Sequence, residues 1–100
     1  MKRLTTPTHQ FVLQMPPETI KEVLITYAQN GKIVLKKTTA DIDRNERVVT
    51  VKLTQEETKM FAADVDAEIE VRVLTLGGDA LASEIIKTPV KRVLNDEVMA

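Results

Sequence analysis

The sequence contains no cysteine and no tryptophan, and it has few aromatic residues of any kind. Without cysteine the chain can form no disulfide, no thiolate nucleophile and no thiolate metal site, which fits a reducing compartment. The aromatic residues are Phe11, Tyr27 and Phe61. A core therefore has to be built from valine, isoleucine and leucine, and β-branched side chains pack well on pleated strands. The composition favours a β protein.

An excess of charge of one sign is also lacking. The chain has fourteen lysines and arginines and fifteen aspartates and glutamates, so the formal net charge is -1. No large electrostatic field is present to attract nucleic acid or anionic lipid. The basic doublets Lys36-Lys37 and Lys91-Arg92 have no aromatic residue between them, so they indicate a solvated strand edge and not a nucleic-acid groove. We expect neither nucleic acid nor membrane as a partner.

Long apolar runs are absent as well. None approaches the roughly 18 residues that a membrane span needs, and Met1-Lys2-Arg3 leads into polar residues and not into an apolar signal segment. A chain of 100 residues has room for one domain. We expect a single domain over residues 1–100, synthesised in the cytoplasm, with loose ends at about 1–8 and 95–100.

Alternating apolar and polar residues predict strands along most of the chain. The expected strands cover residues 11–15, 23–28, 33–37, 48–53, 68–76 and 81–88, with a resumption at 90–94. Asn30-Gly31 predicts a tight hairpin, because both residues tolerate the positive φ of a type I′ turn. Gly77-Gly78-Asp79 predicts a second hairpin turn, whereas Thr38 to Arg47 has no apolar period and is expected to be a polar loop.

The stretch from Leu53 to Leu76 organises the chain. Thr54 and Glu57 have the spacing of a capping box, which predicts a short helix within residues 54–62. Met60 and Phe61 are expected to close this corner against the core. In the strand that follows, Ile69, Val71 and Val73 fall on one face and Glu68, Glu70 and Arg72 on the other, as in a half-buried strand.

Six to seven short strands in a chain of this length predict two antiparallel sheets packed face to face. The expected fold class is all-β, an immunoglobulin-like antiparallel β-sandwich with one short helical turn near residues 55–61. The Cys, Trp, Cys pattern of antibody domains is missing from it.

Acidic residues at two places suggest a test for calcium binding. Asp41, Asp43 and Asn45 occupy the first, third and fifth places of a calcium-loop pattern, but Glu46 replaces the turn glycine and Lys52 the closing glutamate. We interpret the stretch as a solvated turn and predict no metal site.

A second acidic pair, Asp64 and Asp66, precedes the long strand. We interpret it as loop-shaping, with a weak calcium site between loops left as the alternative.

Residues for catalysis are scarce. The chain has one serine, Ser83, and one histidine, His9, and a nucleophile needs a base and an orienting group close to it. Glu68 and Glu70 share a strand face, but Arg72 beside them indicates a charge ladder. We therefore expect no enzyme, no catalytic residues and no cofactor.

Four segments resemble small proteins encoded among the structural and tail genes of phages and prophages of Gram-positive bacteria. They are ITYAQNGKIVLKK (25–37), LTQEETKMF (53–61), VRVLTLGGDALAS (71–83) and VKRVLNDEVM (90–99). The likeness extends from about Thr8 to Met99. It implies synthesis in the bacterial host cytoplasm followed by assembly into a virion, and it transfers no site residues.

Two functions remain in different classes. The first is a non-catalytic structural or adaptor component of a phage or prophage particle, which contacts copies of itself or other phage structural proteins through the edge strand between Leu81 and Val90. The second is a small binding module for carbohydrate or a loop-held cation, using the loops 38–47 and 64–67.

Overall fold

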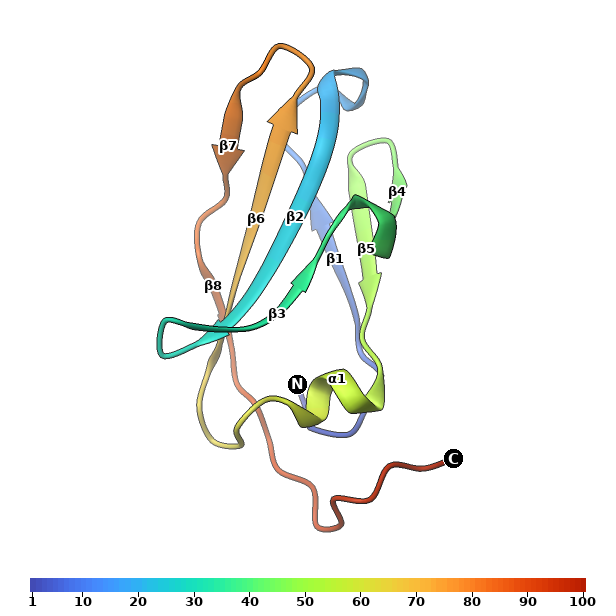
Figure 1. The fold of residues 1–100 in the computed structure, drawn as a ribbon, viewed down its shortest axis with the longest axis vertical. Coiled ribbons are helices and arrows are strands. Elements are labelled where there is room, and N and C mark those ends of the chain that lie inside the picture. Colours follow the sequence, from blue (N-terminus) through green and yellow to red (C-terminus); the bar gives the residue numbers. More distant parts are fainter.

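The computed structural model describes all 100 residues and consists of two antiparallel sheets that face each other, with one α-helix at one end (Figure 1). The strands are β1 (Thr8–Val12), β2 (Ile20–Gln29), β3 (Lys32–Lys37), β4 (Asp43–Asn45), β5 (Val48–Lys52), β6 (Ala67–Thr75), β7 (Ala80–Ala82) and β8 (Ile86–Thr88), and the helix is α1 (Gln55–Lys59). Two 3-10 turns cover Pro17–Thr19 and Thr39–Asp41.

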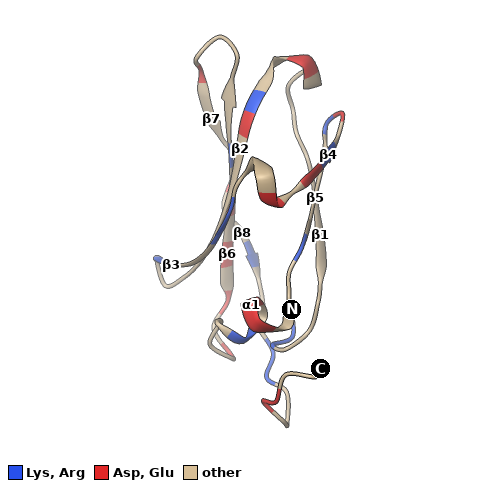
Figure 2. Ribbon diagram, turned by 45° about the vertical axis from the view of Figure 1, so that its right-hand side comes forward, with Lys and Arg blue, Asp and Glu red and all other residues tan.

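The strand order is that of an immunoglobulin-like sandwich. One sheet has the order β1-β5-β4 and the other β3-β2-β6-β7, with β8 also paired to β6. In chain order, β1 to β7 take the places of strands B, C, C′, D, E, F and G of that fold. Figure 2, turned by 45°, shows the two layers apart, with β1, β4 and β5 in one and the remaining strands in the other. The predicted fold class is confirmed.

The core lies between the two layers and is almost wholly aliphatic. The inward side chains are Ile20, Val23, Ile25 and Tyr27 from β2, Val49 and Val51 from β5, and Ala67, Ile69, Val71 and Val73 from β6. On β6, Glu68 and Glu70 are half-buried and Arg72 is exposed, so the predicted alternation of this strand is confirmed.

Val71→Ala should lower the free energy of unfolding by about 1 to 3 kcal/mol, through lost transfer energy and a new cavity. Val71 is 4% exposed and lies opposite Ile25 in the sheet. Urea denaturation measures the effect, and Val12→Ala, at a valine that is 64% exposed, serves as the control. Equal midpoints for the two variants would contradict the placement of Val71 in the core.

The corner after β5 forms as the capping box predicts. The Thr54 N–H donates to Glu57 Oε1 (2.9 Å) and the Glu57 N–H donates to Thr54 Oγ1 (3.1 Å). Phe61 is 1% exposed and closes the corner, but Met60 is 56% exposed, so the prediction for Met60 is wrong. Successive residues of a helical turn point about 100° apart, since a turn has about 3.6 residues, and only one of the two can face the core.

Asn30-Gly31 forms the predicted type I′ hairpin. Asn30 has φ 51° and Gly31 φ 75°, and Gln29 lies opposite Lys32, which leaves a two-residue loop. Both central residues are in the left-handed region that this turn requires.

Several strand assignments differ from the sequence prediction, and the expected strand 81–88 is split into β7 and β8. β1 covers Thr8–Val12 and not 11–15, although the Leu13 N–H still donates to the Arg47 carbonyl (2.8 Å). The predicted loop 38–47 contains β4, an edge strand with all its residues exposed, so it shows no apolar period. The expected strand at 90–94 is absent, because Lys91 makes only an isolated bridge, to Lys2.

The N-terminal segment is hydrogen-bonded and is not the loose arm predicted for residues 1–8. The Lys2–Lys91 bridge is parallel. The Arg3 N–H donates to the Lys91 carbonyl (3.0 Å), and the Lys91 N–H donates to the Met1 carbonyl (2.7 Å). The sequence could not reveal this pairing, because the partner is almost the whole chain away.

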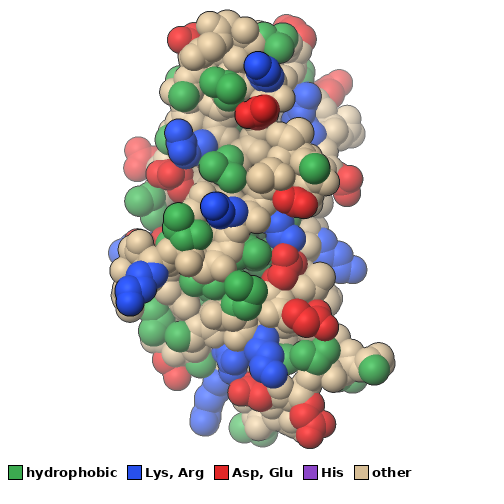
Figure 3. All heavy atoms as spheres, viewed as in Figure 1, with side chains coloured by type: hydrophobic (Ala, Val, Ile, Leu, Met, Phe, Trp, Pro, Cys, Tyr) green, Lys and Arg blue, Asp and Glu red, His purple; other side chains and the backbone are tan.

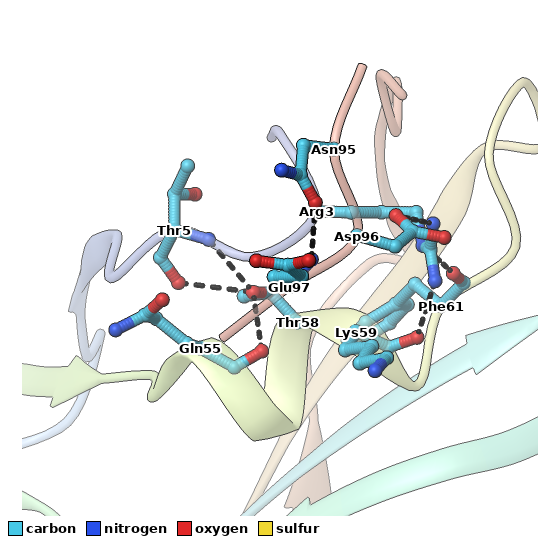
Figure 4. Close-up of polar contacts among 9 residues, drawn as sticks. All are labelled: Arg3, Thr5, Gln55, Thr58, Lys59, Phe61, Asn95, Asp96 and Glu97. Atoms are coloured by element: carbon cyan, nitrogen blue, oxygen red, sulfur yellow. Dashed lines mark hydrogen bonds and ion pairs between the residues drawn. The ribbon is translucent and has the colours of Figure 1, made fainter. Parts of the chain in front are cut away.

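Side chains fix the same segment to α1 (Figure 4). The Arg3 guanidinium donates to the Phe61 carbonyl (2.8 Å) and pairs with Asp96 (2.8 Å). Thr58 Oγ1 accepts from the Thr5 N–H (3.1 Å) and donates to the Thr5 carbonyl (2.9 Å). The segment that joins Met1 to β1 therefore packs on the corner helix.

Charged side chains of both signs are interspersed on the face that Figure 3 shows, with apolar side chains scattered among them. This matches the balanced composition. The single α-helix, of five residues, is far too short to cross a membrane.

Candidate functional site

The two sheets separate along one side of the sandwich, between the edge strand β1 and the edge formed by β7 and β8. The space between them is a groove of about 420 Å³. Its lining consists of residues 10–15, Val71, Val73, residues 81–83 and Ile86. None of these side chains is charged, and most are apolar. We call this feature the open groove.

β1 forms one wall of the open groove and leaves half of its backbone groups without a partner. The Leu13 N–H donates to Arg47, and the Leu53 N–H donates to the Pro7 carbonyl (3.0 Å). Because hydrogen-bonded pairs alternate along an antiparallel ladder, residues 7, 9, 11 and 13 bond to β5. The N–H and C=O groups of Thr8, Gln10 and Val12 therefore point away from β5.

β7 and β8 form the other wall. Leu81 and Ile86 lie opposite the buried Val73 and Ile69 in the sheet, yet they are 46% and 45% exposed. The opposing sheet ends at its edge strand β1 and leaves them uncovered.

The register between β7 and β8 shifts by one residue. Arg72 lies opposite Ala82, but Ile69 lies opposite Ile86. Ser83 sits at this bulge, where its Oγ accepts from the Val71 N–H (3.0 Å) and its N–H donates to the Val71 carbonyl (2.8 Å). The wall is therefore irregular in its middle.

Residues 1–3 fill only one end of the position that a first strand takes in this fold. In this fold a strand A precedes strand B in the same sheet. Here residues 1–3 alone run beside the chain after β8, at Lys91, and the rest of the side between β1 and β7 is uncovered.

The histidine and the serine considered for catalysis are not brought together as a pair. His9 Nδ1 lies 2.7 Å from the Tyr27 hydroxyl, whereas the Ser83 hydroxyl contacts Val71 and Glu84. Burial lowers the pKa of His9, and the N-terminal ammonium lowers it further. Burial also raises the pKa of Tyr27, with a contribution from the nearby Glu57 carboxylate. Tyr27 is part of the core, and His9 lies half-buried beside it.

Glu57 has a structural role beyond the capping box. Burial of its side chain raises its pKa, but hydrogen bonds from Lys37 and from the Thr54 N–H outweigh this and lower the pKa overall. The Lys37–Glu57 ion pair thereby joins β3 to the corner helix, and this accounts for one lysine of the first basic doublet.

The carboxylate of Asp41 accepts hydrogen bonds from Thr38, within the same turn. It accepts from the Thr38 N–H (2.9 Å) and from the Thr38 hydroxyl (3.0 Å), and these hydrogen bonds lower its pKa. Asp43 and Asn45 lie on β4, exposed to solvent. No group of three histidine or acidic side chains is placed to hold a metal ion.

A second, polar hollow of about 510 Å³ lies beside the β2–β3 turn, where Asp64, Asp66 and Glu68 come together with Lys87. Glu68 Oε1 accepts from the Gly31 N–H (2.9 Å). The sequence identified the aspartate pair, but not its proximity to the hairpin turn.

No protein-family model matches the chain, and neither does any curated protein. Among solved structures, the V domain of amphioxus IgVJ-C2 is similar with a TM-score of 0.38 and 13% sequence identity, over 90% of this chain and 96% of that one. So distant a likeness carries no functional argument, and the fold assignment depends on the strand order.

Proposed function

We propose that the domain is a non-catalytic structural or adaptor protein that works by contacts with other proteins, as a component of a phage or prophage particle. The open groove carries the proposal: an apolar surface lies between two strand edges. The resemblance of four sequence segments to phage structural and tail-region proteins supports the particle setting.

Strand edges bind other chains because their unpaired N–H and C=O groups are a template for a further strand. The segment between Leu81 and Ile86 contains one charged residue, Glu84. Leu81, Ile85 and Ile86 are each 45–56% exposed. A docked chain would remove this apolar surface from water, which stabilises the complex by about 25 cal/mol for each Å² buried.

The parent protein is expected to self-associate or to bind neighbouring particle proteins through this side. The double variant Ala82→Lys, Ile86→Lys places one ammonium group inside the groove, at Ile86, and a second on the outer face of the β7 edge, at Ala82 opposite Arg72. It should lower the association state, because docking would have to desolvate the first and bring a partner close to the second. Sedimentation of parent and variant across a concentration series measures this.

The control is Ile33→Lys, on the far edge strand β3 at a side chain that is 62% exposed. It adds charge without touching the groove. Circular dichroism confirms that all three proteins are folded. A parent that is monomeric at high concentration and binds no neighbouring particle protein, or a double variant that associates as the parent does, contradicts the proposal.

A small binding module is the second candidate, and the polar hollow is the observation that favours it. Its carboxylates are not all free to bind a ligand, since Glu68 accepts a hydrogen bond from the Gly31 N–H and the ammonium group of Lys87 lies in the same hollow. A carbohydrate platform needs an exposed aromatic face, but Tyr27 and Phe61 are 0% and 1% exposed and Phe11 is half-buried.

Calcium at millimolar concentration should leave the melting temperature unchanged. A ligand held by the native state must stabilise it, and neither the Asp41 loop nor the hollow offers a complete set of oxygen ligands. Differential scanning calorimetry with calcium, and with magnesium as the control salt, measures this. A rise of several degrees with calcium alone would favour the binding module.

A further inference from the structure

We infer that the open groove takes one extended strand of another protein, which pairs antiparallel with β1, carries no charge over about five residues and presents apolar side chains at alternate positions. The inference rests on the proposed function, for which it specifies the edge, the direction and the partner's chemistry. Each of these follows from a different feature of the groove.

The edge is β1, because this strand is regular and unprotected. Thr8, Gln10 and Val12 present their backbone groups outward at every second residue. Protein edges that avoid pairing carry lysine, proline or a bulge, and β1 has none of these within Thr8–Val12. A strand can therefore add to the β1-β5-β4 sheet along the full length of β1.

The β7–β8 edge is less suited to backbone pairing. Its outward groups are those of Ala80 and Ala82, since the Thr75 and Ser83 N–H groups bond across the β6–β7 ladder. The one-residue shift at Ser83 interrupts this row before β8 begins, and bulges blunt edges in this way. We assign to this wall the contact with the occupant's side chains.

The chemistry of the occupant follows from the uncharged lining. Residues opposite His9, Phe11 and Leu13 would point into the groove, because directly opposite residues of an antiparallel pair share a face. There they would meet Leu81 and Ile86 of the other wall. A charged side chain at such a position would lose its hydration without gaining a partner.

The direction follows from the short N-terminal strand. Residues 1–3 run parallel to the chain at Lys91, beyond the end of β8, and the chain reverses through Leu4, which has φ 58°, before it enters β1. A strand that lies in the groove ahead of Met1 and runs in the same direction as residues 1–3 is antiparallel to β1. Antiparallel pairing also gives the straighter hydrogen bonds.

The C-terminal tail of a second copy fits the groove poorly. Leu94 and Met99 are 96% and 78% exposed. Side chains alternate between the two faces of a strand, so a tail that points Leu94 into the groove also points Asp96 into it, and one that points Met99 inward also points Glu97 inward. Met99 is also bonded to the Gln55 side chain by two hydrogen bonds of 2.9 Å. The C-terminal tail is therefore not the occupant, and the inference takes a segment of a different protein in its place.

A fusion of the full chain tests the inference. Six residues of alternating valine and threonine are joined ahead of Met1 through a flexible glycine-serine linker, because the occupant's C-terminal end would lie beside Met1. The linker gives the strand a millimolar effective concentration. Amide hydrogen exchange by NMR should slow about tenfold or more at Gln10 and Val12 relative to the parent, with Ala82 unchanged.

A matched fusion has proline at each threonine. The threonines lie opposite Thr8, Gln10 and Val12 and would exchange hydrogen bonds with them, so proline removes the donors to β1 and keeps the valines. This fusion should show parent-like exchange. In the valine-threonine fusion, Ile86→Lys should abolish the protection and Ile33→Lys should leave it intact.

Unchanged exchange at Gln10 and Val12, slowing at Ala82 instead, or equal protection by the proline fusion would overturn the inference. Protection through exchange of the strand between two copies supports it, since the same amides are covered. The sedimentation of the unfused parent reports separately on self-association, so failure of one proposal can be told from failure of the other.

Discussion

Phe61→Ala should lower the free energy of unfolding by about 3 to 5 kcal/mol. The ring is 1% exposed and meets Tyr27 edge to face, with centroids 6.0 Å apart. Its removal leaves a cavity where the corner helix joins the core. A domain of this size has about 5 to 15 kcal/mol in total, so this loss is a large fraction of the total. Urea denaturation at 25 °C measures the change.

Met60→Ala is the matched control, one residue earlier and 56% exposed. It should change the free energy of unfolding by no more than about 0.5 kcal/mol. If the two variants lose equal stability, Phe61 does not close the core, and the arrangement of the corner is wrong.

Gln29→Ala should lower the free energy of unfolding by about 2 to 4 kcal/mol, because it leaves several partly buried backbone groups without hydrogen-bond partners. Gln29 is 8% exposed. Its amide nitrogen donates to the carbonyls of Ala62 (2.9 Å) and Val65 (3.0 Å), and its oxygen accepts from the Ala62 N–H (2.8 Å). This side chain connects the end of β2 to the loop between α1 and β6.

Gln10→Ala, on the exposed side of β1, is the control for Gln29. Thermal and urea unfolding should show a large loss for Gln29→Ala and almost none for Gln10→Ala. A Gln29 variant as stable as the parent would mean that water or another side chain replaces the amide, and that the loop after α1 does not depend on it.

Local signals predicted much of this fold. Asn30-Gly31 needs only its own φ angles to make the hairpin, and Thr54 with Glu57 satisfies helix N–H groups within four residues. The period of two in β6 shows which residues face the core. Where such signals repeat along the chain, the two-sheet sandwich follows from packing the apolar faces together.

The features that the sequence did not predict depend on distant partners. Gln29 is buried because it meets the loop after α1, and no pattern around it distinguishes it from a surface glutamine. The N-terminal segment is ordered by Lys91, and β4 by its pairing with β5. Partners of this kind become visible only when the chain is folded.

One wall of the open groove was predicted from the sequence and the other was not. The lightly charged segment Leu81 to Ile86 marked the β7–β8 edge, and the structure places it at the side of the sheet as expected. The opposite wall was not recognised, because the outward direction of Thr8, Gln10 and Val12 depends on the register of β1 against β5. The sequence prediction placed this strand at 11–15, so Thr8 and Gln10 were not expected to lie in it.

Amide hydrogen exchange along β1 in the unmodified protein, at a concentration where it is monomeric, examines the free edge itself. Phe11 and Leu13 donate toward β5 and should exchange slowly, whereas Thr8, Gln10 and Val12 donate to water and should exchange fast. This alternation is the expected result. Uniformly slow exchange would mean that the edge is already covered, and uniformly fast exchange that β1 is not part of the sheet; either would contradict an open groove ready for another strand.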